Sequence, residues 1–172
     1  MPPLTSKNES TKQSAGKILL RDVEEDDLPL FFAHQLDPEA NYLAAFTAKD
    51  PTDRDAFIAH WAKILADENI TIRTIMFAGQ VAGHIVSHSW FGDPEISYWI
   101  GKEYWGQGIA TQALSEFLNL VKIRPLYARV VKDNLASFRV LEKCGFIMDG
   151  EDKGFANARG QEVEEFILKF GK

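Results

Sequence analysis

The chain has 172 residues, of which 45% are hydrophobic, and this size and composition predict one compact domain. A formal net charge of −6 argues against a nucleic-acid partner, because non-specific binding to phosphate backbones needs a basic surface, and this charge suits a cationic amine. No apolar run approaches the roughly 20 residues of a membrane-spanning helix, and residues 1–16 lack the apolar core of a signal peptide, so we expect a cytoplasmic protein without a membrane partner.

The first predicted elements follow residues 1–16, a polar segment that we expect to be disordered because it has almost nothing to bury. A single domain is expected over 17–172, and it opens with a short strand over 18–23. Acidic residues then precede a helical pattern over 28–36, where they suit the partial positive charge at the beginning of a helix.

The middle of the chain changes from helix to strand character. Asp37 and Pro38 end the first helix, and a second is expected over 52–66, where apolar residues recur at helical spacing. Alternating β-branched and aromatic residues then predict three strands, which are separated by turns and lie over 70–78, 81–91 and 95–100. Three consecutive strands with short connections predict an antiparallel meander.

The last third of the chain returns to helices that alternate with strands. Apolar residues on one side predict a helix over 109–121, which is followed by a strand over 126–131 and a helix over 134–143. Two further strands are expected over 146–151 and 162–170, with a polar loop between them. The predicted fold is α/β (α+β), a mixed sandwich around one sheet.

The run GKEYWGQGIATQAL, residues 101–114, lies between the third meander strand and its helix and combines two glycines with a small alanine. The first amides of a helix have no internal partner, the helix dipole adds positive charge, and small residues let a phosphate approach the main chain. Phosphate binding is therefore one interpretation. The other is an ordinary helix beginning, where glycines serve only for tight packing.

Two familiar phosphate loops do not fit this run. A nucleotide-kinase loop needs Lys and then Ser or Thr after its last glycine, where this chain has Ile109 and Ala110. A dinucleotide-binding fingerprint with Gly106 and Gly108 as its first glycines would place its third on Thr111. That fingerprint also requires a βαβ unit, whereas an antiparallel meander precedes this loop.

A third scheme fits, because the loop resembles the pyrophosphate loop of the GNAT N-acetyltransferase superfamily. That loop is written Arg/Gln-x-x-Gly-x-Gly/Ala, and Gly108 and Ala110 match its two small positions. The first position of the loop holds Trp105 instead of Arg or Gln. An aromatic residue followed by glycine at this point resembles the loops of the RimJ/RimL-type branch. Since the loop works through backbone amides, the departure puts little in doubt.

A second block, DNLASFRVLEKCGF over 133–146, is similar to the conserved block of the same superfamily that begins with Asn and Ser and ends in LEKxGF. The two blocks occur in the expected order, with a strand between them. The resemblance extends over about 17–170, although the part before Ile70 matches only in pattern. It implies the GNAT fold, in which helices flank both faces of a mixed, mostly antiparallel sheet.

The resemblance implies acetyl-CoA as cosubstrate, held by loop amides at the pyrophosphate, by a strand edge along the pantetheine arm, and by the beginning of the later helix. A main-chain N–H near Ile100 would stabilise the oxyanion of the reaction. Asn134 would bond to the CoA arm and also suits a helix N-cap. The expected cofactor-binding residues are Tyr98, Trp99, Ile100, Trp105, Gly106, Gln107, Gly108, Ile109, Ala110, Thr111, Asn134, Ser137 and Phe138.

Two residues are expected to be catalytic. Ser137 matches the position proposed to protonate or hydrogen-bond the departing thiolate, and Phe146 lacks the hydroxyl of the Tyr that many members use nearby. Glu95 is our first candidate for the general base, because it opens the strand beside the acyl site. His84 and His88 lie on one face of the neighbouring strand and could assist, but hydrogen-bonded structural histidines are expected more often.

Other reactive or aromatic residues have weaker assignments. Cys144 is the one cysteine, so we expect no intrachain disulfide and a small buried side chain rather than a nucleophile. His, Cys and carboxylate residues show no metal-ligand spacing, so no metal is expected. Aromatic residues before and within the meander could line the acceptor site or belong to the core, namely Tyr42, Phe46, Trp61 and Trp90.

The predicted function is transfer of acetyl from acetyl-CoA to a primary amine by direct attack in a ternary complex. The acceptor is expected to be an amine-bearing small molecule or a protein N-terminus, and a homodimer is compatible with the sequence. An acyl-CoA-binding sensor or interaction domain that lost its chemistry is the alternative, since no base is unmistakable. A nucleotide-dependent oxidoreductase is disfavoured by the meander and the missing third glycine.

Overall fold

The protein was analysed as a computed structural model that describes residues 16–172, so the segment expected to be disordered lies outside the described residues except for Gly16. The described part has five α-helices, two short 3-10 helices and seven strands. In chain order these are β1 (Ile18–Arg21), η1 (Glu25–Asp27), α1 (Leu28–Gln35), α2 (Pro38–Ala44), α3 (Arg54–Ala66), β2 (Thr71–Phe77), β3 (Gln80–His88), β4 (Glu95–Ile100), η2 (Lys102–Tyr104), α4 (Ile109–Leu120), β5 (Leu126–Val131), α5 (Leu135–Lys143), β6 (Ile147–Ala156) and β7 (Gln161–Phe170).

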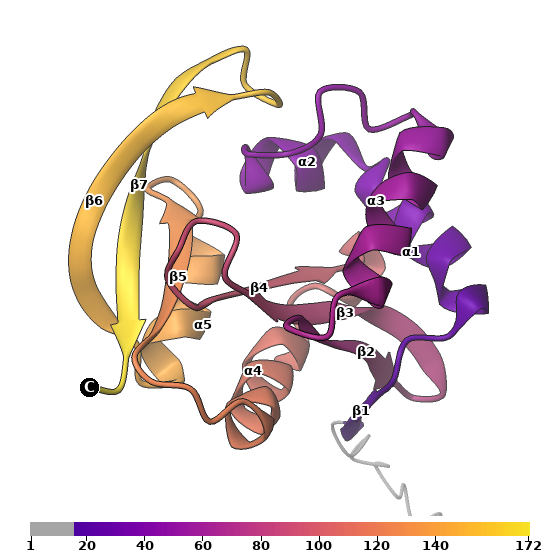
Figure 1. Cartoon of the computed structure of the whole chain (residues 1–172), viewed down its shortest axis with the longest axis horizontal. Helices are drawn as coiled ribbons and strands as arrows, with labels where there is room; N and C mark the ends of the chain where they lie inside the picture. Colours follow the sequence, from indigo (N-terminus) through magenta and orange to yellow (C-terminus); the bar gives the residue numbers. More distant parts are fainter. Residues whose placement is uncertain (1–15) are drawn as a thin grey trace, which may run out of the picture.

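All seven strands form one sheet in the order β1-β2-β3-β4-β5-β7-β6 (Figure 1). Neighbouring strands are antiparallel except β4 and β5, which run parallel and pair only between Glu95 and Tyr127. The meander predicted over β2, β3 and β4 is confirmed. Because β4 and β5 pair only where they begin, they separate along the rest of their length, and the sheet is open in its middle.

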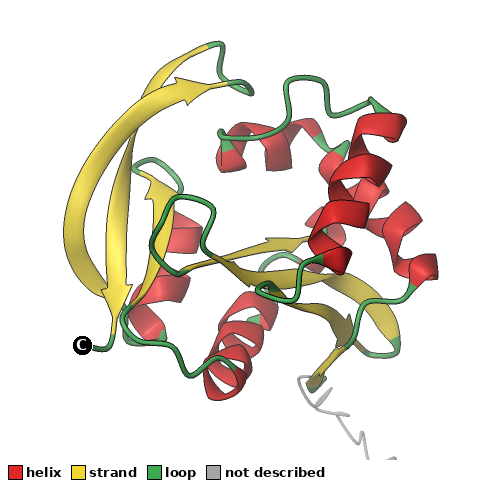
Figure 2. Cartoon of the chain, in the orientation of Figure 1, coloured by secondary structure: helices red, strands yellow, loops and turns green. Residues whose placement is uncertain are grey.

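Helices cover both faces of the sheet, as Figure 2 shows, which confirms the predicted fold class. One core lies between α4, α5 and the sheet. The apolar side of α4 that the periodicity predicted is buried here, and it consists of Ile109, Ala113, Leu114, Phe117, Leu118 and, just past the helix, Val121. A second core lies on the opposite face, where α1 and α3 contribute aromatic residues that contact each other.

Helix α2 is a difference from the sequence prediction. Asp37 and Pro38 do end the first helix, but they also begin α2, because the Asp37 side chain accepts a hydrogen bond from Ala40 N at 2.8 Å and Pro38 occupies the first helical turn. The same two residues therefore end α1 and begin α2. No helix was predicted over these residues, and α2 has only seven residues, which is too short for a clear helical pattern in the sequence.

The final hairpin is longer than predicted, with ten residues in each of β6 and β7. Most side chains of β6 are exposed and polar, so its sequence lacks the apolar alternation from which a strand is predicted. The tip of the hairpin reaches the segment just after α2 (Figure 1), where Asn157 Nδ2 donates to Thr47 O at 2.8 Å and Ala158 N donates to Ala45 O at 3.2 Å. The tip of the hairpin is thus tied to the end of α2 beside the opening in the sheet.

Cys144 is half-buried rather than fully buried, and its thiol donates to Thr111 O at 3.5 Å. Burial raises the pKa of this thiol, which keeps it protonated and a poor nucleophile, as expected. Of the helices in residues 16–172, none combines the length and apolar character needed to cross a bilayer. The described residues also contain no cluster of three or more His, Cys, Asp or Glu side chains that could hold a metal ion.

Candidate acetyl-CoA and acceptor site

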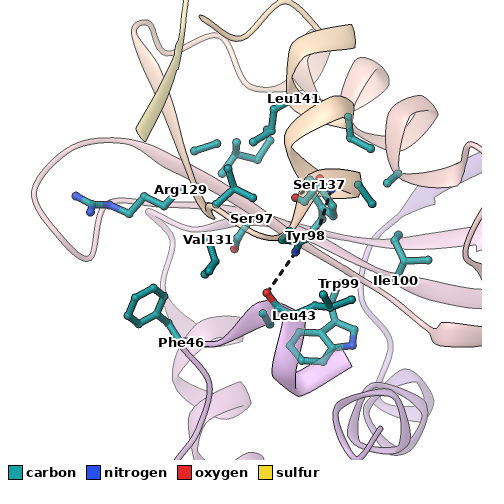
Figure 3. A pocket seen from close by; sticks show the side chains of 18 of the residues that line it. Leu43, Phe46, Ser97, Tyr98, Trp99, Ile100, Arg129, Val131, Ser137 and Leu141 are labelled. Atoms are coloured by element: carbon teal, nitrogen blue, oxygen red, sulfur yellow. Dashed lines mark hydrogen bonds between the residues drawn. The ribbon is translucent and has the colours of Figure 1, made fainter. Parts of the chain in front are cut away.

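A cavity of about 1000 Å³ occupies the opening between β4 and β5. Its walls come from β3, β4 and β5, the beginnings of α4 and α5, the end of α2 with the loop after it, and the β6–β7 hairpin (Figure 3). Elements from both ends of the chain therefore meet at one place. A volume of this size is at the upper end of the range of small-molecule and cofactor sites.

The loop before α4 has the backbone geometry that a phosphate site needs. Gly106 and Gly108 have φ angles of 75° and 76°, and Gly108 is the N-cap of α4 in the left-handed conformation. Gln112 N is the first amide to bond into the helix, to Gly108 O at 3.1 Å, so the amides of the preceding turn have no helical partner. A Cβ at Gly108 would meet only Gln112 Nε2, at 4.0 Å, and would otherwise enter open space. These residues fit a pyrophosphate.

Trp105 makes two hydrogen bonds to the residues that precede the loop. Its indole Nε1 donates to Ile100 O at 2.8 Å, and its main-chain N donates to Lys102 O at 3.1 Å. The side chain thus ties the loop to the end of β4. Trp105 therefore already occupies one acceptor position of the Ile100 carbonyl, which is not available to the pantetheine arm expected along this strand.

Ser137 and Tyr98 form a hydroxyl pair inside the cavity, with 2.8 Å between their oxygen atoms (Figure 3). Ser137 lies in the first turn of α5, and Tyr98 reaches it from β4, across the opening of the sheet. Burial raises the pKa of Tyr98 to about 12, so its phenol remains protonated. A protonated phenol can donate to the Ser137 oxygen and leave the serine proton free for a substrate atom.

Asn134 caps α5 as predicted, since its Oδ1 accepts from Ser137 N at 3.3 Å. Its Nδ2 donates to Leu43 O at 3.3 Å, which joins the beginning of α5 to α2. The amide keeps one further donor and one further acceptor position. A bond to a CoA arm is therefore compatible with both contacts.

Glu95 lies in a charged cluster around Arg129 rather than at a solvated strand end. Arg129 bonds to Glu95 at 3.0 Å, to Glu165 at 2.8 Å and to Asp152 at 3.0 Å, and all four side chains line the cavity. Burial disfavours the charged form of Arg129, but these hydrogen bonds outweigh it and raise its pKa. Burial also raises the pKa of Glu165, against the opposing effect of Arg129. Three carboxylates around one guanidinium leave the cluster negative when all are ionised.

His84 and His88 both line the cavity on one face of β3, as predicted. Burial lowers the pKa of His84 to about 3 and that of His88 to about 4, so both are neutral near pH 7. The His88 ring stacks on Trp90 at 3.8 Å between centroids, and the His84 ring packs edge-on against Trp61 at 4.9 Å. His84 Nδ1 has no hydrogen-bond partner among residues 16–172. Both rings are thus packed against aromatic neighbours, which agrees with the structural role expected for them.

The low pKa of His84 gives a pH-dependent contribution to stability. Its folded pKa of about 3 lies below the unfolded value of 6.5, so the unfolded chain takes up the proton first as pH falls. As the pH falls from 6.5 to 4.5, the protonation of His84 in the unfolded chain should therefore lower the unfolding free energy by about 2 kcal/mol. Denaturant unfolding at these two pH values should show a smaller loss for His84→Gln than for the wild type, and an equal loss would contradict the assignment.

Most of the predicted cofactor residues line this cavity. Gln107 and Phe138 do not, because Gln107 bonds to Glu103 O outside it and Phe138 packs against Phe166, 5.4 Å between ring centroids. The residues that line it are Tyr98, Trp99, Ile100, Trp105, Gly106, Gly108, Ile109, Ala110, Thr111, Asn134 and Ser137.

Of the four aromatic residues named as candidates for the acceptor site, two line the cavity and two do not. Phe46 and Trp90 line the cavity, whereas Trp61 belongs to the core under α3 and Tyr42 lies outside beneath the Arg159 guanidinium, 3.7 Å from its ring centre. Sequence reasoning missed the residues that reach the cavity from separate strands. Arg129 on β5 is the clearest of these, and its position within a buried strand was the available signal.

Comparison with known proteins agrees with this architecture. A family model described as an acetyltransferase (GNAT) domain matches residues 17–147. Uncharacterized N-acetyltransferase p20 of Bacillus licheniformis is 24% identical over 85 residues, which cover 47% of this chain and 48% of that protein. The alignment covers 64% of a second curated relative, from Bacillus subtilis, so the chain spans about half to two thirds of the curated relatives that it matches.

Two solved structures share the fold. Mycobacterium smegmatis RimJ, solved with CoA-disulfide, has a TM-score of 0.76 at 22% identity, and the match covers 91% of this chain and 82% of that one. Spermidine N-acetyltransferase from Vibrio cholerae, solved with CoA and spermine, has a TM-score of 0.73 at 19% identity, covering 89% and 95%. At these identities the likeness concerns the fold alone, whereas the family model covers most of the sequence. The chain belongs to the GNAT acetyltransferase family.

Proposed function

We propose that this protein is an acetyl-CoA-dependent N-acetyltransferase of the RimJ/RimL type that acetylates a primary amine. The observation that carries the proposal is the cavity between β4 and β5, which brings the free amides at the beginning of α4 and the Ser137 hydroxyl into one space. The names of the RimJ and spermidine acetyltransferase structures, which include CoA and spermine, support the same chemistry. The acceptor is either a small amine or a protein N-terminus.

Acetyl-CoA would be held mainly by backbone groups. The amides from Gly106 to Thr111 would bind its pyrophosphate, because they lie at a helix N-terminus and no side chain covers them at Gly108. Asn134 would bond to the pantetheine arm with its remaining donor or acceptor. The cosubstrate supplies an acetyl thioester, and the protein supplies orientation and proton transfer.

Two side chains would handle the protons of the reaction. Ser137 would donate a hydrogen bond to the departing thiolate, with Tyr98 donating to the serine oxygen from behind. Glu95 would accept the proton of the amine, directly or through water, because it is a buried carboxylate on the strand that borders the cavity. Attack would occur directly on the thioester, without a covalent enzyme intermediate.

The role of Glu95 predicts a large effect on turnover. Glu95→Gln keeps the shape and the hydrogen bond to Arg129 but removes the basic carboxylate, so kcat should fall on the order of 100-fold near pH 7. Steady-state kinetics with a saturating amine measures this, and Glu116→Gln on the exposed side of α4 is the matched control. A larger loss in Glu165→Gln than in Glu95→Gln would move the base to Glu165.

The proposal is tested by binding and turnover together. Acetyl-CoA at a hundredfold excess over its Kd should stabilise the protein by about 2.7 kcal/mol and raise the Tm by several degrees. Thiol release should follow when a panel of amines and N-terminal peptides is added. Stabilisation without thiol release from any acceptor would instead favour an acyl-CoA sensor, and absence of stabilisation would contradict both functions.

A further inference from the structure

The chain adopts an unusual conformation where α2 ends beside the cavity. Ala45 has a φ of 61° and a ψ of −59°, and Phe46 N donates to Ala44 O at 2.7 Å, which closes a three-residue γ-turn. Ala45 is completely buried, although residues with a Cβ rarely adopt positive φ. Such a conformation persists only where the surrounding structure imposes it.

The tip of the β6–β7 hairpin contacts this turn directly and holds it in place. Ala158 N donates to Ala45 O at 3.2 Å, and Arg159 Nε donates to Tyr42 O at 2.6 Å. Arg159 is itself held by Asp133, at 2.8 and 2.9 Å, next to the beginning of α5. Three elements distant in sequence thus hold the turn in place.

The turn places the Phe46 side chain against the cavity. Figure 3 shows Phe46 and Trp99 on either side of Leu43 at the wall opposite α5. The ring lies against β6, where a Cβ added to Gly154 would come within 3.4 Å of Phe46 Cε1. Phe46 nevertheless remains 43% exposed, so an apolar ring faces open space within the cavity.

Phe46 is one of several apolar groups in a cavity that also carries negative charge. Trp90 is 49% and Phe91 is 71% exposed, and both line the cavity with Phe46. On the same lining, the carboxylates around Arg129 exceed the positive charge that they contact. Exposed apolar surface inside a concave site favours an apolar ligand group, and excess carboxylate favours a cation.

We infer that the acceptor is a primary amine whose nitrogen lies within a few bonds of an apolar, aromatic group, and that Phe46 selects for that group. The inference rests on the proposed N-acetyltransferase function and specifies its substrate class. Free arylalkylamines and protein N-termini that begin with an aromatic residue share this chemistry. Amines without an apolar body, such as ethylamine and spermidine, bind more weakly because they leave Phe46 and Trp90 in contact with water.

Calorimetric titration of the CoA-loaded protein tests the inference without requiring turnover. Phenylethylamine should bind on the order of tenfold or more tightly than ethylamine, and Phe46→Ala should remove most of this difference. Phe46→Leu should retain part of it, since an apolar side chain remains. Phe155→Ala is the matched control, because Phe155 is an exposed aromatic residue on β6 that does not line the cavity.

Equal binding of phenylethylamine and ethylamine, tighter binding of spermidine, or equal effects of Phe46→Ala and Phe155→Ala would overturn the inference. Acetylation of ethylamine and phenylethylamine with equal kcat/KM would overturn it while leaving the N-acetyltransferase function intact. Selective binding of phenylethylamine without acetylation would count against that function and leave the subsite supported. Tighter binding of a Phe-Ala dipeptide amide than of phenylethylamine would assign the subsite to protein N-termini, and the reverse order would assign it to free amines.

Discussion

Gly108→Val is expected to weaken acetyl-CoA binding on the order of 100-fold, since each hydrogen bond to a charged group contributes about 1.5 to 3 kcal/mol. The branched side chain would enter the open space beside the free amides of α4, where we place the pyrophosphate. It would also oppose the left-handed backbone at this residue, where φ is 76°. Calorimetric titration with acetyl-CoA measures the change in Kd.

Gly79→Val separates these two effects. Gly79 has the same φ of 76° and equally open surroundings, but it lies in the turn between β2 and β3. Both variants should lose on the order of 1 to 2 kcal/mol of unfolding free energy from backbone strain. Only Gly108→Val should lose affinity for acetyl-CoA, and an equal loss of affinity in both variants would refute the phosphate assignment of the loop.

Ser137→Ala is expected to reduce kcat on the order of 100-fold, because a preorganised hydrogen bond aimed at developing charge is worth about 3 kcal/mol in an active site. The KM for acetyl-CoA should change little, since the backbone amides at α4 remain. Tyr98→Phe should reduce kcat in the same direction but by less, because it removes only the donor behind Ser137. Steady-state kinetics with saturating amine and varied acetyl-CoA measures both parameters.

The control for the serine is Ser115→Ala, which makes the same chemical change on the exposed side of α4. It should leave kcat unchanged. If Ser137→Ala also left kcat unchanged, or raised the KM without lowering kcat, Ser137 would be a binding or structural residue. In that case the thiolate would have to be stabilised by another group.

The sequence predicts best those parts of the fold in which a local residue pattern is compatible with only one structure. The apolar side of α4 is fully buried, and the glycines before it take the left-handed conformations that their loop needs. Helix α2 escaped prediction because Asp37 and Pro38 mark both the end of one helix and the beginning of the next. Propensity alone cannot distinguish these two uses of the same residues.

The site shows the same division. Ser137, Asn134 and the glycine loop could be predicted because each belongs to a contiguous motif. The Arg129 cluster could not, since its carboxylates come from β4, β6 and β7, and their proximity depends on the order of strands in the sheet. The contact between Tyr98 and Ser137 likewise joins β4 to α5 across the opening in the sheet, and no local pattern in the sequence indicates it.

Acetyl transfer from CoA to an amine nitrogen is tested most directly with an isotopically labelled acetyl group. The protein, acetyl-CoA carrying the label and phenylethylamine or an N-terminal peptide should yield the labelled amide, detected by mass spectrometry, with one free CoA thiol for each amide formed. The Ser137→Ala variant should form it far more slowly. Tight binding of acetyl-CoA, with no labelled amide from any amine above the rate without protein, would contradict the account.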